Sequence, residues 1–210
     1  MLDSTDTKPS LRRTIVEAAD RVIREHGLAG TTTREIAREA GCAEGSIYVH
    51  FEDKIDLVIA VILEGEPHFA RLVELPGSAG EGTVEANLAA WADEVLALMG
   101  DNLPIFLALL GDRAVFDRFA ERMHERGTGL IAAVGAAAAY VRAEQELGRI
   151  DPAADPEVVA GAIVGACRDQ ALRSLLGPVD RRPGTGFARE LARILVAGLE
   201  PAARSRGGRR

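Results

Sequence analysis

Hydrophobic and polar positions recur along most of this chain with the period of an α-helix. Apolar residues stand three and four positions apart, which places them on one face of a helix. No stretch alternates with the period of two that is typical of a half-buried strand. The pattern predicts an all-α protein of about nine helices. We expect these helices at about 11–26, 32–40, 44–50, 53–63, 83–99, 104–110, 114–146 (with a bend near Gly127 and Gly129), 156–176 and 186–199.

The ends of the second and third helices carry specific sequence signals. Thr32 and Glu35 have the spacing of a capping box, in which each side chain satisfies a free backbone donor near the other. Gly41 lies between the two helices, where a glycine can adopt a left-handed conformation at little steric cost. Three short helices joined in this way predict a helix-turn-helix, whose second helix enters the major groove of DNA. Its buried contacts are expected from Ile36, Ala37, Ala40, Ile47 and Phe51.

Composition narrows the class of protein but does not identify it. Hydrophobic residues make up 47% of the 210 residues, which is typical of a globular protein. We find no secretory signal, no transmembrane run, no metal-ligand spacing, no phosphate-binding loop and no nucleophile motif. The sequence therefore predicts a cytoplasmic protein that is not an enzyme, with no cofactor and no bound metal.

The acidic charge taken by itself argues against DNA binding. The formal net charge is −7, whereas nucleic-acid binders usually have a basic surface. Residues 1–58 contain 8 Lys and Arg against 11 Asp and Glu, so the helix-turn-helix region is not net basic either. What matters is which charges face the DNA. Arg34 and Lys54 are candidates, while Arg12 and Arg13 fit either DNA contacts or a solvated first helical turn.

Residues 11–63 resemble the tetracycline-repressor (TetR) family of bacterial transcription regulators. The resemblance is carried by Gly27, Thr32-Thr33, Ile36-Ala37, Ala40-Gly41, the ungapped run Gly45-Ser46-Ile47-Tyr48-Val49-His50-Phe51, and then Lys54 and Leu57. Beyond residue 63 only the length, the number of helices and the Asp155-Pro156 helix start match. The resemblance implies domains at 1–52 (arm and helix-turn-helix) and 53–203 (effector binding and dimerisation, with 53–74 as linking helix). The charged composition of 204–210 predicts an Arg-rich, disordered tail.

The resemblance also implies which residues bind double-stranded DNA. Contacts to phosphates are expected from Thr33, Tyr48, His50 and Lys54, and positions near base edges from Arg34, Glu44, Gly45 and Ser46. Lys54 lies in the first turn of a helix, where a positive charge opposes the helix dipole, so we expect it to bind phosphate rather than to stabilise the fold. Glu44 is unusual, because a carboxylate can accept from cytosine N4 but is repelled by phosphates.

The family implies a homodimer formed by the last two long helices, and therefore a palindromic operator. Small residues at Gly161, Ala162 and Gly165 would allow close approach of two helices. A stripe of Leu191, Ile194 and Leu195 could complete a four-helix interface. The alternative is that these residues pack within one protomer.

Between these regions the resemblance implies a pocket for an apolar small-molecule effector. The candidate lining residues are Trp91, Met99, Phe106, Phe116, Phe119, Met123 and Tyr140, which could equally be ordinary core residues. Taken together, the sequence predicts a repressor that binds its operator as a dimer and is released by the effector. The alternatives are a helical-bundle enzyme and a dimeric scaffold with a structural N-terminal domain.

Overall fold

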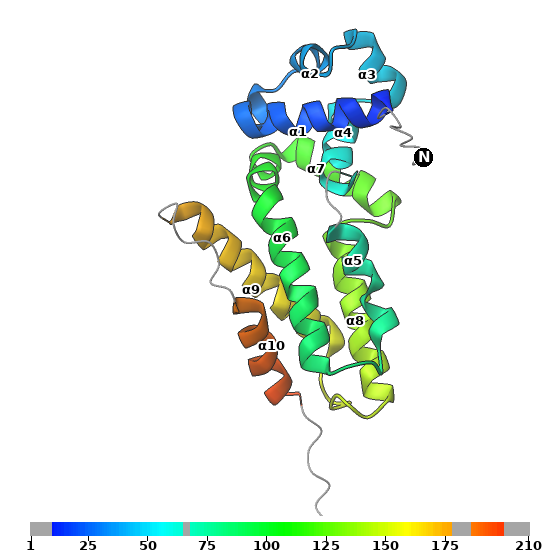
Figure 1. Cartoon of the computed structure of the whole chain (residues 1–210), viewed down its shortest axis with the longest axis vertical. Helices are drawn as coiled ribbons and strands as arrows, with labels where there is room; N and C mark the ends of the chain where they lie inside the picture. Colours follow the sequence, from blue (N-terminus) through cyan, green and yellow to red (C-terminus); the bar gives the residue numbers. More distant parts are fainter. Residues whose placement is uncertain (1–9, 65–67, 178–185, 200–210) are drawn as a thin grey trace, which may run out of the picture. The chain divides into compact units, whose positions relative to one another are not determined.

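The computed structural model describes residues 10–64, 68–177 and 186–199, and every regular element in these ranges is a helix (Figure 1). The all-α prediction is confirmed. No helix in the described ranges is both long and apolar enough to cross a membrane. The elements are α1 (Leu11–Gly30), α2 (Thr33–Ala40), α3 (Glu44–His50), α4 (Lys54–Glu64), α5 (His68–Glu74), the 3-10 turn η1 (Leu75–Ser78), α6 (Val84–Leu110), α7 (Arg113–Glu125), α8 (Leu130–Glu146), α9 (Pro156–Leu176) and α10 (Phe187–Ala197).

Two of the expected helices form one. The segments 83–99 and 104–110 are both part of α6, which contains Pro104 in its interior. A proline removes the hydrogen bond to the carbonyl four residues earlier, here that of Gly100. Gly100 is exposed, so water can solvate this carbonyl and the helix continues.

One expected helix forms two. The segment 114–146 is divided into α7 and α8, and it is interrupted rather than bent. Gly127 and Gly129 both have positive φ angles, 58° and 83°, which a right-handed helix cannot contain. Gly27 acts more mildly, because its φ of 71° kinks α1 without ending it.

The chain folds as two compact units. The first combines α1 to α4 with residues 102–127, and the second combines residues 68–101 with the described residues after 127. The expected domain boundaries at residues 52 and 203 concern function and stay a prediction. The expected arm and Arg-rich tail lie outside the described residues.

Helix α4 forms the centre of the first unit. Its residues from Ile55 to Ile62 are all buried, as the nearly continuous apolar run indicated. It packs against α1 on one side and α7 on another. The buried residues of α1 include Ile15, Ala19 and Val22. Ile47 of α3 and Phe51 directly after it belong to the same hydrophobic core as α4, and this core holds α3 in place.

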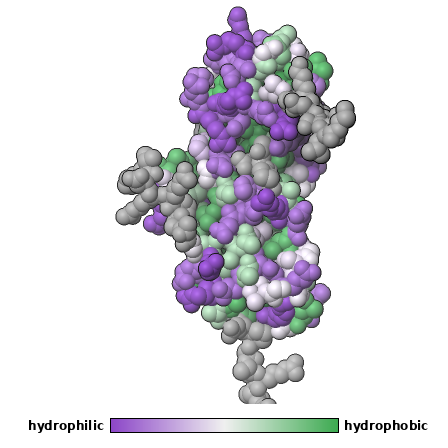
Figure 2. Space-filling view, in the orientation of Figure 1, coloured by the Kyte–Doolittle hydropathy of each residue, from purple (hydrophilic) through white to green (hydrophobic). Residues whose placement is uncertain are grey.

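The second unit is built around α8, which packs against α9, α5 and η1. The buried face of α8 includes three small residues, Ala133, Ala137 and Ala138, which let neighbouring helices approach closely. Helix α10 packs on α9. Hydrophilic and hydrophobic areas are interspersed over the surface in view (Figure 2), so the apolar residues left outside the cores do not gather in one field there.

Candidate nucleic-acid interface

Helices α2 and α3 form a helix-turn-helix whose turn is fixed by local hydrogen bonds. Gly41 adopts the left-handed conformation with φ of 68°, and the Cys42 amide donates to the Ala37 carbonyl at 2.9 Å. The predicted capping box is present. The Glu35 amide donates to the Thr32 hydroxyl at 3.2 Å, and the Thr32 amide donates to the Glu35 carboxylate at 2.9 Å. The angle between the two helices is therefore set by residues that are neighbours in sequence.

Helix α3 buries one side and exposes the other. Ile47 is fully buried and Phe51, at its C-terminal end, is 2% exposed. Tyr48 and Val49 between them are 55% and 79% exposed. Beside Val49, the open side of α3 contains the residues predicted to face DNA, namely Glu44, Gly45, Ser46, Tyr48 and His50, of which Ser46 is half-buried.

A hydrogen-bonded cluster joins the first turns of α2 and α3. The Thr33 hydroxyl donates to Glu44 Oε1 at 2.7 Å, and the Tyr48 hydroxyl lies 3.2 Å from Thr33 Oγ1. The structure thus brings together three of the residues predicted to bind DNA. It also shows a contact that the sequence did not indicate, because Thr33 and Glu44 were assigned to phosphates and bases separately.

The expectation that Lys54 has no structural role is wrong. Its ammonium donates to the carbonyls of Leu28 and Thr31, at 2.6 Å and 2.5 Å, and so connects the start of α4 to the end of α1. Burial lowers the pKa of Lys54, and the nearby Glu35 carboxylate opposes this change. An ammonium has three hydrogens, so one remains for a phosphate. The predicted phosphate contact of Lys54 therefore stays a prediction.

Three arginines, two on α7 and one directly after it, bind three carboxylates at the α3–α4 junction. Sequence analysis did not find this cluster, although the spacing of four residues between the arginines was a visible signal. Arg122 is central: it lies 3.0 Å from Glu52, 3.2 Å from Asp53 and 3.7 Å from Asp56. The outer pairs are Arg118 with Asp53 and Arg126 with Asp56. The three arginines neutralise carboxylates that lie directly after α3 in the chain.

Arg12, left open by the sequence, is used inside the protein. Its guanidinium pairs with Glu64 and lies over the Phe51 ring, 5.0 Å from the centroid. The hydrogen bond to Glu64 raises the pKa of Arg12. Arg13 pairs with Glu17 one turn along α1. Arg34 is exposed on α2, and its expected place near base edges stays a prediction.

The predicted dimer residues lie on a face of α9 and α10 that is largely open in the single chain. Gly161 and Ala162 are exposed, and Ile194 is 56% exposed. Gly165, Leu191 and Leu195 are half-buried. The opposite side of α9 is buried in the unit's core.

The seven effector-pocket candidates are divided between the two units. Trp91, Met99 and Tyr140 belong to the second unit, and Phe106, Phe116, Phe119 and Met123 to the first. Trp91 is a core residue whose indole donates to the Leu72 carbonyl at 3.1 Å. Tyr140 is fully buried and accepts from the Asn87 amide at 3.0 Å, and burial raises its pKa. Phe106 and Phe119 meet edge to face, 6.4 Å between centroids.

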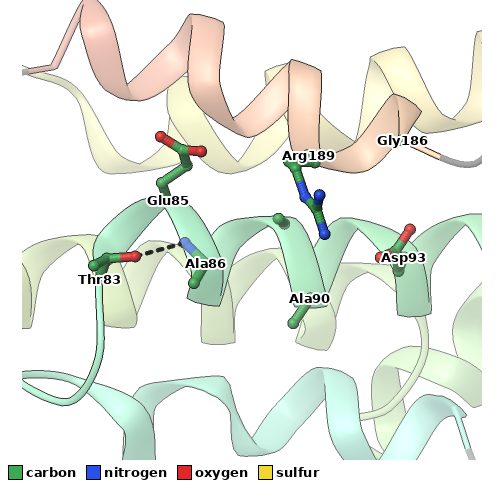
Figure 3. A pocket seen from close by; sticks show the side chains of 8 residues that line it. Thr83, Glu85, Ala86, Ala90, Asp93, Gly186 and Arg189 are labelled. Atoms are coloured by element: carbon green, nitrogen blue, oxygen red, sulfur yellow. Dashed lines mark hydrogen bonds between the residues drawn. The ribbon is translucent and has the colours of Figure 1, made fainter.

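Two cavities are lined by other residues. A cleft of about 600 Å³ lies between α6 and α10, with an alanine floor and with charged side chains at Glu85, Asp93 and Arg189. Figure 3 shows Arg189 reaching from α10 towards α6. A second cavity of about 310 Å³ lies in the first unit and includes Lys54, Leu109 and Arg118 in its wall. The seven candidates stay a prediction.

Comparison with known proteins gives the N-terminal part a family. Residues 15–61 match the family model of the bacterial regulatory proteins, tetR family. The HTH-type transcriptional regulator TtgR of Pseudomonas putida is 42% identical over 66 residues, which are 30% of this chain and 31% of TtgR. The HTH-type transcriptional repressor AcnR of Corynebacterium diphtheriae is 37% identical over 70 residues, 33% of this chain and 37% of AcnR. The chain thus matches about a third of the length of these curated relatives.

The fold is shared over a much longer range than the sequence. The crystal structure of the transcriptional regulator FadR from Bacillus subtilis, in complex with stearoyl-CoA, superposes with a TM-score of 0.66 at 19% identity. The superposition covers 90% of this chain and 99% of FadR. The fold of this chain is therefore shared with FadR over nearly the whole length of both, at a sequence identity that shows the fold alone.

Proposed function

The chain belongs to the tetR family of bacterial regulatory proteins, and from this premise we propose that it is a repressor that binds a palindromic operator as a homodimer. Its relatives are transcriptional regulators, and AcnR is named a repressor. The single observation that carries the proposal is the open side of α3. It presents small and hydrogen-bonding side chains on a helix that is rigidly held by Ile47 and Phe51.

The proposed DNA contacts follow from this geometry. Arg34, Glu44, Gly45 and Ser46 lie at the ends of α2 and α3 that would approach base edges. Phosphates are bound by Thr33, Tyr48, His50 and the third hydrogen of Lys54. The acidic charge of the region does not prevent this, because Arg118, Arg122 and Arg126 neutralise the carboxylates at the α3–α4 junction.

Homodimerisation and release by an effector complete the proposal. The open face of α9 and α10 supports a dimer, and two symmetry-related heads read two half-sites. A small, apolar effector shifts the dimer population away from the conformation in which the two helix-turn-helix units have the spacing that DNA binding requires. The structure of FadR with stearoyl-CoA supports this step, since it shows that a protein of this fold holds a ligand with a long apolar chain. No catalytic role is proposed, because the relatives are regulators.

The proposed function is tested by DNA binding. A gel-shift series with duplexes from beside the protein's own gene should reveal salt-sensitive binding to a palindromic sequence. Arg34→Ala should weaken operator binding by about 10-fold and relax the preference at the contacted base pair. Arg113→Ala is the matched control: it removes one exposed positive charge, paired with Asp117 on α7, and should change binding by about twofold or less. Absence of salt-sensitive binding to all these duplexes contradicts the proposal.

A further inference from the structure

The first turn of α3 places a carboxylate on the donors that the proposed function assigns to DNA phosphates. Glu44 Oε1 accepts from the Thr33 hydroxyl at 2.7 Å, and Tyr48 contacts the same hydroxyl at 3.2 Å. Thr33 and Tyr48 are two of the four proposed phosphate contacts. Glu44 is an exposed residue, so the contact is not imposed by burial in a core.

The hydrogens of this cluster can be assigned from its chemistry. A hydroxyl has one hydrogen to donate, and an ionised carboxylate can only accept. Thr33 therefore gives its hydrogen to Glu44, and Tyr48 gives its hydrogen to Thr33. Both hydroxyl hydrogens are used inside the protein, in the order Tyr48 to Thr33 to Glu44. A DNA phosphate also only accepts, so it cannot take the Thr33 hydrogen while Glu44 stays in place, and it gains the Tyr48 hydrogen only if Tyr48 leaves Thr33.

The carboxylate resembles the ligand that it excludes. Like a phosphate oxygen, Glu44 Oε1 is anionic and takes a short hydrogen bond from a hydroxyl. Its position in the first turn of α3 is favourable for a negative charge. It also repels an approaching phosphate, because two like charges in contact at a protein surface oppose each other.

We infer, resting on the proposed function, that Glu44 is an internal substitute for a DNA phosphate and thereby suppresses binding to non-cognate DNA. In the major groove, the amino group of cytosine is a donor that a carboxylate can accept. Where an operator presents this amino group, Glu44 gives up its hydrogen bond from Thr33 and accepts one from the cytosine instead. The hydroxyls of Thr33 and Tyr48 then donate to the phosphates. Elsewhere the carboxylate keeps its place. Glu44 is thus a specificity-determining residue that makes the phosphate contacts depend on a base contact.

The experiment compares two variants on two duplexes by fluorescence anisotropy at low salt. Glu44→Ala should bind a random-sequence duplex about 10-fold more tightly than the wild type, because the Thr33 hydroxyl is released and one repulsion is lost. Its affinity for the duplex found in the gel-shift series should not rise by as much, so the ratio of the two affinities narrows. Glu25→Ala is the matched control, since it removes an exposed carboxylate from α1. It should change neither affinity by more than about twofold.

A second pair of variants separates released hydroxyls from simple charge repulsion. In a Thr33→Val background Glu44 accepts from no hydroxyl, so Glu44→Ala releases none and should gain only about threefold on the random duplex. A full tenfold gain in that background overturns the inference, as does a Glu44→Ala protein that behaves like Glu25→Ala. Thermal unfolding verifies that each variant is folded, and Glu44→Ser, whose side chain is too short to reach the Thr33 hydroxyl, replaces Glu44→Ala if the latter is not. If wild type and Glu44→Ala bind no duplex at all, the proposed function fails and the inference falls with it.

Discussion

Two side chains at the start of α2 stabilise the first helix of the helix-turn-helix. Thr32 and Glu35 close the N-terminal end of α2 by reciprocal hydrogen bonds. The Thr32 hydroxyl, followed by its amide, lowers the pKa of the Glu35 carboxyl. This cap lies directly beside Thr33, so the same turn both stabilises the helix and positions a proposed phosphate donor.

The lowered pKa of Glu35 predicts a pH-dependent contribution to stability. A carboxyl whose pKa is lower in the folded state stabilises the fold at pH values above its unfolded pKa, and this stabilisation is lost as the pH falls through the folded value. Glu35→Gln should therefore lower the free energy of unfolding at pH 7, and the difference from wild type should vanish at strongly acidic pH. Urea unfolding at several pH values measures this difference.

The control for this prediction is a carboxylate on the same helix that makes no cap. Glu39→Gln removes the exposed partner of Arg21 and should leave the pH profile of stability close to that of wild type. Thr32→Ala should cost about 1 kcal/mol at pH 7, because it removes the other half of the cap. A Glu35→Gln penalty that is equal at pH 7 and in acid contradicts the interpretation.

At the scale of elements, α7 holds the junction between α3 and α4. Arg122 is mostly buried and bridges the three carboxylates there, with Asp56 only 8% exposed. Since α3 ends where this junction begins, the position of α3 depends on α7, which follows some seventy residues later in the chain.

Breaking the arginine cluster should loosen this junction. Arg122→Met keeps the apolar stem but leaves Glu52 and Asp53 with fewer partners, which should lower the free energy of unfolding by about 2 kcal/mol. Amide hydrogen exchange should accelerate at residues 50–56 in particular. Arg113→Met, which breaks only an exposed pair with Asp117, should cost about 0.5 kcal/mol or less. Equal effects of the two substitutions would show that the cluster does not hold the junction.

At the scale of the whole molecule, the proposal depends on two copies of the chain. One helix-turn-helix reads only a few base pairs, and a two-fold axis doubles the sequence that is read. The open face of α9, with Gly161 and Ala162, is the surface proposed for this axis. Exposed apolar residues alone do not define an interface. The dimer proposal is therefore tested by introducing a charge on this face of α9.

Ala162→Glu should separate the protomers. A carboxylate without a partner in a closed helix interface should weaken dimerisation by about 100-fold or more. Sedimentation velocity at micromolar concentration should then show a monomer, while wild type remains a dimer, and operator binding should weaken in parallel. Ile131→Glu places the same charge at an exposed apolar position of α8 and should leave the dimer intact. A monomeric wild-type protein contradicts the dimer proposal directly.

The sequence by itself determined the helix-turn-helix. The capping box, the left-handed Gly41 and the buried residues of α3 depend on neighbours within a few positions, and such local preferences are visible in a single sequence. They were found with the correct residues. Helix ends at Pro104 and Gly127 were predicted less well, because the proline in α6 was tolerated and the bend was a complete break.

Only the tertiary structure decided how the charged residues are used. Lys54 binds the Leu28 carbonyl 26 residues away, Arg12 pairs with Glu64 across 52 residues, and Arg122 reaches Asp53 across 69. A long side chain can satisfy its charge with DNA, with water or with a distant part of the same chain. Which of these it meets depends on how the helices pack, and no local pattern contains that information.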